Sequence, residues 1–195
     1  MVSEAGWAQK TAQALLSREL PLRWAHTGGV AARSLQLAGV LGPDSELLTA
    51  ACWMHDIGYS GGLAVSGFHP LDGARYLRDY SSAPELLCRL VAYHSAALED
   101  AARRGLAGTL TSEFAPPPPH LADALTFCDM TTGPDGTVVT VEERLAEICD
   151  RYGPDHAVTV SVQGSSAALT AAVRRVTAWV AAAATASGPG SFAAG

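Results

Sequence analysis

Histidine and aspartate residues with metal-ligand chemistry gather in the first two thirds of this 195-residue chain. His55 and Asp56 are adjacent, and four of the six histidines fall between positions 26 and 94. An imidazole and a carboxylate together suit a divalent ion such as Fe, Mn, Co or Zn. For an isolated pair, the simpler interpretation is an aspartate that caps a helix beside a partly buried histidine.

The pair is not isolated. His26 precedes Gly28 and Gly29, which would let another segment or a ligand approach closely. Asp129 lies near the end of an otherwise apolar stretch, where a carboxylate without a partner would be costly. Two imidazoles and two carboxylates are therefore candidate ligands of one metal centre, with coordination positions left for water and substrate. These four residues are His26, His55, Asp56 and Asp129.

Helices must position these residues, because helical patterns dominate the chain and the two β-like runs, 138–139 and 158–162, are short. Ser45 is the expected cap of the third helix, and Thr140 with Glu143 forms a capping box. We expect an all-α fold in one domain over residues 1–186, with a disordered tail over 187–195. The predicted helices cover residues 3–19, 22–41, 46–54, 69–80, 84–93, 120–130, 140–152 and, rich in alanine, 165–186.

The charge balance excludes one class of partner. Thirteen Lys and Arg against nineteen Asp and Glu give a net charge of −6, which argues against binding a nucleic-acid polymer. A phosphorylated small molecule remains compatible, because a bound ion adds positive charge. The apolar stretch 176–186 is too short to cross a membrane, and no signal core is present, so we expect a cytoplasmic protein. The four cysteines form no C-x-x-C pair, which favours reduced, buried thiols.

The order of the four candidate ligands resembles that of the HD superfamily of metal-dependent phosphohydrolases. The central sequence Met54-His-Asp-Ile-Gly58 adds to this resemblance, which spans roughly residues 20–150. It implies a core of five or more helices around a divalent metal, with an added N-terminal helix and the alanine-rich C-terminal helix outside it.

His69 and His94 stand where binuclear members of the superfamily place additional ligands, an order similar to that of HD-domain hydrolases of diadenosine tetraphosphate. The resemblance implies that Asp56 bridges two ions, with His69 and His94 on the second. A simpler reading stays open, in which His69 begins a helix and His94 sits at a helix C-terminus. The centre is therefore expected to hold one or two ions.

The resemblance also implies the reaction, hydrolysis of a nucleotide or another small phosphorylated molecule by metal-activated water. Asp56 is the expected catalytic residue. Arg23, three residues before His26 and on the same helix face, is a candidate substrate-binding residue or a solvated charge. Tyr59, where such hydrolases often carry lysine, is the second substrate-binding candidate. Weaker candidates, because helical arginines usually lie on the surface, are Arg75, Arg144 and Arg151.

Two other functions are also compatible with the sequence. Some HD-domain proteins are mixed-valent di-iron oxygenases that cleave C–C or C–P bonds and share the six-ligand order, and others are non-catalytic nucleotide sensors. His120 and His156 fit no ligand position. The last helix, with Val173, Val176 and Trp179, is expected either to pack on the core or to form the seam of a homodimer.

Overall fold

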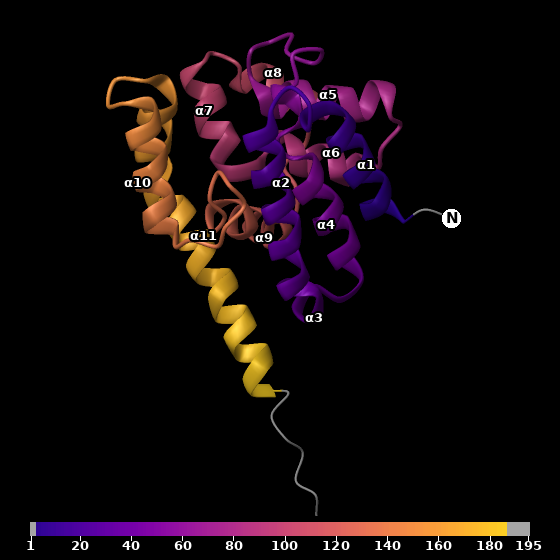
Figure 1. The fold of residues 1–195 in the computed structure, drawn as a ribbon, viewed down its shortest axis with the longest axis vertical. Coiled ribbons are helices and arrows are strands. Elements are labelled where there is room, and N and C mark those ends of the chain that lie inside the picture. Colours follow the sequence, from indigo (N-terminus) through magenta and orange to yellow (C-terminus); the bar gives the residue numbers. More distant parts are fainter. Residues whose placement is uncertain (1–2, 187–195) are drawn as a thin grey trace, which may run out of the picture.

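The computed structural model describes residues 3–186, and the named elements in this part of the chain are all helices (Figure 1). The only β-type pairing within it is an isolated bridge between Thr132 and Val138, so the all-α prediction is confirmed. The expected tail, 187–195, lies outside the described residues. In chain order the elements are α1 (Glu4–Leu16), α2 (Pro21–Ser34), η1 (Leu35–Leu37), α3 (Ala38–Leu41), η2 (Gly42–Asp44), α4 (Ser45–Met54), η3 (Ile57–Tyr59), α5 (His69–Tyr80), α6 (Glu85–Ala92), η4 (His94–Ala96), α7 (Ala97–Arg103), α8 (Ala107–Glu113), α9 (Pro119–Met130), α10 (Val141–Tyr152) and α11 (Ala157–Ala186), where η marks a 3₁₀ turn.

Local sequence accounts for several helix starts. The Ser3 hydroxyl accepts a hydrogen bond from the Gly6 amide at the start of α1, and the predicted capping box of Thr140 and Glu143 opens α10. The predicted Ser45 cap is wrong. Its hydroxyl instead donates to the Gly42 carbonyl, so the helix begins at Ser45 itself without a side-chain cap.

Three segments differ from the sequence prediction because of packing. Helices α7 and α8 were not predicted, and α11 begins at Ala157 rather than at residue 165. Val158 and Val162, part of a β-like run, lie in this helix and pack against the core. Burial on one helix face thus outweighs the β preference of valine.

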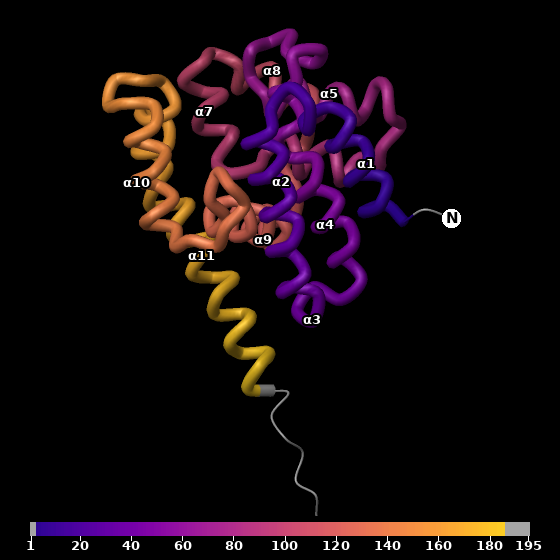
Figure 2. Tube along the Cα trace, viewed as in Figure 1, coloured from indigo at the N-terminus to yellow at the C-terminus, as the bar shows by residue number. Residues whose placement is uncertain are grey.

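Helix α9 lies among α2, α4, α6 and α11 and contacts each of them. Helix α1 packs on α4 at one side of the molecule, whereas α10 and α11 lie at the other (Figure 2). The C-terminal half of α11 extends beyond the body (Figure 1). Val173 and Val176 nevertheless lie in the core of their own chain, with Trp179 packed beside it.

The structure also bears on the expectations for the cysteines and for membrane-spanning helices. Cys52, Cys88 and Cys128 are buried free thiols as predicted, whereas Cys149 is only half-buried. No helix within residues 3–186 has both the length and the apolarity needed to cross a membrane.

Candidate metal centre

The six predicted ligand residues come together in two adjoining groups. We call His26, His55 and Asp129 the inner group, and Asp56, His69 and His94 the outer group, because His69 is the most exposed of the six. Within each group, one candidate ligand atom per residue lies within 4.8 Å of the others. The residues come from α2, the chain after α4, the start of α5, η4 and the end of α9.

The backbone fixes the orientation of three of these histidines. The Nδ1 atoms of His26, His55 and His94 lie 2.9, 2.8 and 2.7 Å from the carbonyl oxygens of Gly133, Cys52 and Val91. Nδ1 must donate to a carbonyl, so in the neutral ring Nε2 carries a free lone pair. This second contact is typical of histidines that bind a metal.

The two carboxylates face the Nε2 atoms of the histidines. Asp56 Oδ2 lies 3.2 Å from His55 Nε2, and Asp56 Oδ1 lies 3.3 Å from His69 Nε2. Asp129 Oδ1 lies 3.0 Å from His26 Nε2. Asp56 therefore stands between the inner and outer groups, with one oxygen toward each.

The unpaired atoms of this centre fit a cation. His55 Nε2 is buried and makes no hydrogen bond, although Asp56 lies beside it. His69 Nε2 and His94 Nε2 are 3.1 Å apart, and His94 Nε2 is an acceptor because its Nδ1 is the donor. Imidazole nitrogens and carboxylate oxygens gathered in this way are the ligands that a borderline divalent ion prefers, so the residues fit the metal.

Charge around the centre points the same way. Burial lowers the pKa of His94 to about 3, with a further contribution from His69. Burial works against a charged His55, but Asp56 outweighs it and raises the pKa of His55 to about 9. Burial also opposes ionisation of Asp56, yet Arg23 and His55 hold its pKa well below the usual range. The carboxylates therefore stabilise a positive charge at His55 Nε2, which a proton or a metal ion can provide.

Comparison with known proteins identifies the family. The HD domain family model matches residues 23–155, well over half of the chain and every one of the six candidate ligands. The chain belongs to the HD-domain family. No curated protein and no solved structure matches it. Helix α11 lies after the matched region.

Two glycines let the segments of the HD domain approach closely enough to build the centre. A Cβ at Gly58 would lie 2.0 Å from the His69 carbonyl oxygen, so only glycine allows α5 to begin against η3, which follows Asp56. A Cβ at Gly29 would lie 2.4 Å from the Gly136 carbonyl oxygen. Gly29 thus admits the turn whose Gly133 carbonyl binds His26, as its place after His26 had suggested.

The HD domain also contains a ligand-positioning residue that sequence reasoning missed. The Ser95 hydroxyl donates a hydrogen bond to Asp129 Oδ2. Ser95 and Ala96 have φ values of +47° and +63°, a left-handed conformation that is strained for residues other than glycine. The only sequence signal was the position of Ser95 directly after His94.

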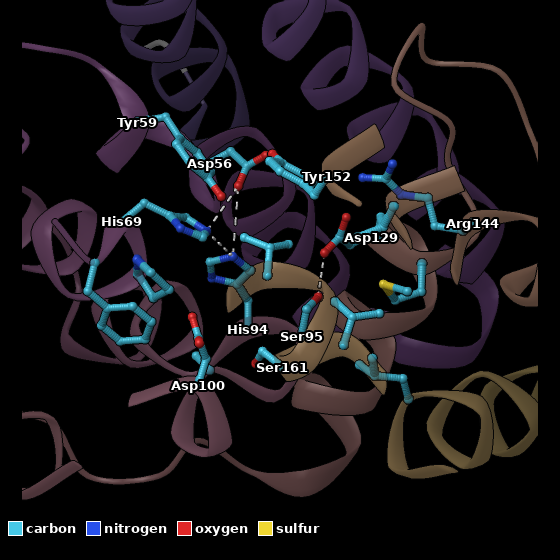
Figure 3. A pocket seen from close by; sticks show the side chains of 18 of the residues that line it. Asp56, Tyr59, His69, His94, Ser95, Asp100, Asp129, Arg144, Tyr152 and Ser161 are labelled. Atoms are coloured by element: carbon cyan, nitrogen blue, oxygen red, sulfur yellow. Dashed lines mark hydrogen bonds and ion pairs between the residues drawn. The ribbon is translucent and has the colours of Figure 1, made fainter. Parts of the chain in front are cut away.

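A cavity of about 130 Å³ opens beside the outer group. Figure 3 shows Asp56 and His69 on one side of it, with Asp129 and Arg144 on the other. Its further lining includes Arg23, Tyr59, Ser95, Arg104, Ile148, Arg151, Tyr152, Val158, Ser161, Val162 and Leu169.

The predicted substrate-binding residues line this cavity, but each also contacts the centre. Arg23 Nη1 lies 2.7 Å from Asp56 Oδ2, and its guanidinium lies over the Tyr59 ring at 4.1 Å. The other partner of Tyr59 is His69, with ring centroids 3.9 Å apart. Arg23 and Tyr59 therefore hold Asp56 and His69 in place as well as facing the cavity.

The remaining arginines and histidines of the HD domain divide clearly. Arg144 is only 5% exposed and Arg151 lines the cavity, so the surface position expected for Arg144 is wrong. Arg75 pairs with Glu113 and does not line the cavity. His120 lies 3.6 Å from Asp44, and His156 stacks on Tyr152. Neither histidine joins the centre, as expected.

Proposed function

We propose that this HD-domain protein is a metal-dependent phosphohydrolase that acts on a nucleotide or another small phosphorylated molecule. The proposal rests on one observation: six His and Asp side chains that can hold a metal lie together, and four of them line a cavity that arginines also line, namely Asp56, His69, His94 and Asp129. HD domains are mostly metal-dependent hydrolases, which agrees with this chemistry.

The inner and outer groups would hold one or two divalent ions, chosen from Fe, Mn, Co and Zn by the mixed imidazole and carboxylate donors. A bound ion would lower the pKa of water toward neutrality and neutralise charge on phosphoryl oxygens. The net reaction joins the oxygen of water to phosphorus and breaks the ester P–O bond, and the departing oxygen takes a proton.

The side chains of the chain orient this reaction. Asp56 is the proposed catalytic residue, since it lines the cavity and stands between the two groups. Its low pKa makes it a weak proton acceptor, so its role is to hold charge and orient the attacking water. The cations that line the cavity favour a phosphate there, since Arg23 and Arg151 both border it.

The test combines metal analysis of the purified protein with phosphate release from a panel of phosphoesters. The panel includes nucleoside monophosphates, diadenosine tetraphosphate, cyclic nucleotides and simple phosphomonoesters. We expect stoichiometric divalent metal and release from at least one class. Asp56→Ala should lose metal and turnover with an unchanged circular dichroism spectrum. Asp150→Ala, at an exposed position of α10, is the control that should keep both.

Two results would replace this proposal by another. A mixed-valent iron signal with O₂ consumption and no phosphate release would make the protein an oxygenase of the HD type. Nucleotide binding without turnover, unchanged in a folded His55→Ala variant, would make it a sensor.

A further inference from the structure

Arg144 has a buried donor without a partner. Its side chain is 6% exposed and borders the cavity, and Nη1 lies 2.5 Å from Glu147 Oε2. Its Nε is buried and makes no hydrogen bond. A guanidinium N–H that is removed from water and left unpaired is costly, so this atom is a candidate donor to an anionic ligand.

The neighbouring arginines strengthen this reading. Arg23, Arg144 and Arg151 line both the cavity beside the outer group and a second one of about 270 Å³. Arg23 is held by Asp56 and Arg151 by Glu147. Arg144 and Arg151 share the single carboxylate of Glu147, so their guanidinium groups have N–H donors left for a further anion.

Beyond the arginines, the side chains that α10 and α11 contribute to the cavity are mostly apolar. Ile148 and Tyr152 follow Arg144 at four-residue steps along one face of α10. Beside them α11 contributes aliphatic side chains and one hydroxyl to the same cavity, namely Val158, Ser161, Val162 and Leu169. These α11 residues lie outside the region that matches the HD domain family. The α11 part of the cavity wall therefore lies outside the region shared with the family, and among its described lining residues Ser161 has the only side chain that offers a hydrogen bond to a base or a sugar.

The volume limits what this wall can hold. A cavity of ~150 Å³ binds a benzene-sized molecule. The cavity here measures about 130 Å³. A phosphoryl group bound at Arg144 would occupy part of this space, so an apolar substituent of fewer than about six carbon atoms fits the rest.

We infer that the substrate is a phosphomonoester with a compact apolar substituent. Arg144 Nε binds a phosphoryl oxygen, and the substituent packs against Val162 and Leu169. This inference rests on the proposed function and narrows its substrate class from nucleotides to small apolar esters.

Binding of phosphonates tests the inference without requiring turnover. Methylphosphonate, n-pentylphosphonate and thymidine monophosphate are titrated by calorimetry into the full chain with the metal it carries after purification. We expect n-pentylphosphonate to bind at least about tenfold more tightly than the other two, since each buried methylene adds affinity. Val162→Ala should remove most of this preference, whereas Val160→Ala, at an exposed position of the same helix, should keep it.

Arg144 has its own pair of variants. Arg144→Lys keeps a positive charge but lacks the Nε donor, so it should weaken both phosphonates by about the same factor, at least roughly tenfold. Arg174→Gln, exposed on α11, should change neither affinity.

Equal affinity for the two phosphonates, or tighter binding of the nucleotide, would overturn the inference. So would an unchanged preference in Val162→Ala. The proposed function fails separately, since it requires phosphate release from some ester whatever its substituent. Release of phosphate from pentyl phosphate and glycerol phosphate with equal kcat/KM would retain the function and reject the inference.

Discussion

Asp56 is the residue that connects the inner and outer groups. Its Oδ2 lies 4.0 Å from His26 Nε2 in the inner group, and its Oδ1 lies 3.9 Å from His94 Nε2 in the outer group. Arg23 binds the same carboxylate and stacks on Tyr59, which stacks on His69. A single carboxylate is thus restrained from several directions, and it could contribute one oxygen to an ion at either group.

The left-handed conformation of Ala96 leads to a testable prediction. A left-handed conformation destabilises a residue with a Cβ by ~1–2 kcal/mol. Glycine has no such steric cost, but it loses ~0.5–1 kcal/mol more chain entropy on folding. Ala96→Gly should therefore raise the free energy of unfolding by up to ~1 kcal/mol and Tm by ~2–4 °C. Thermal unfolding followed by circular dichroism measures this. Ala102→Gly, on the exposed side of α7, should lower Tm, and an equal fall in both variants would refute the strain at Ala96.

Residue type and spacing were enough to find the six candidate ligands, because imidazoles and carboxylates in a familiar order stand out in a sequence. Arg144 and Ser95 could not be found in this way. The burial of Arg144 depends on how α10 packs beside α11, and the hydrogen bond of Ser95 depends on its positive φ. Neither property is visible in a helical pattern of arginines and serines.

Close contact between η3 and α5 depends on Gly58. A methyl group there would overlap the His69 carbonyl, so Gly58→Ala should cost about 3 kcal/mol and displace His69 from Asp56. Urea unfolding and metal content measure the two effects. Gly108→Ala is the matched control in α8, where an added Cβ meets nothing within 4 Å. It should stabilise by ~0.5–1 kcal/mol, and a similar small gain at Gly58 would contradict the contact.

Glu113 joins α8 to α5. Arg75, and then Arg78, bind its carboxylate and hold the pKa of Glu113 below its ordinary value. A lowered pKa stabilises the fold above the unfolded value of about 4.3, and this contribution is lost as pH falls through the lower folded value. Glu113→Gln should lower the free energy of unfolding by ~1 kcal/mol at pH 7 and by progressively less below about pH 4. Urea titrations at several pH values measure the difference, and a gap that widens in acid would exclude this ion pair as its cause.

Helix starts with a local signal could be predicted, as at the capping box of α10 and at Pro70 in α5. Helices α7 and α8 and the first turns of α11 lack such signals. Ala101 and Leu110 are buried in the core where α7 packs on α8, and Val158 is helical because it packs on the core. Tertiary packing determines the secondary structure of these segments, and the local sequence pattern does not show this packing.

The centre draws its ligands from segments throughout the domain, so a bound ion should stabilise the whole molecule. At a free concentration about 100 times Kd, binding adds ~2.7 kcal/mol. For a chain of this size, Tm should rise by roughly 5–10 °C. Thermal unfolding with and without the divalent ion measures the rise. Asp56→Ala should abolish it, and an equal rise in that variant would place the ion elsewhere.

His26 and Asp129 meet across 103 residues of chain. Contacts of such sequence separation require closure of a long loop, so we expect them to form late in folding. The interactions that an ion makes with both residues are then largely absent at the folding barrier. Metal binding would consequently slow unfolding far more than it speeds refolding, so a bound ion would prolong the lifetime of the folded protein rather than guide its formation.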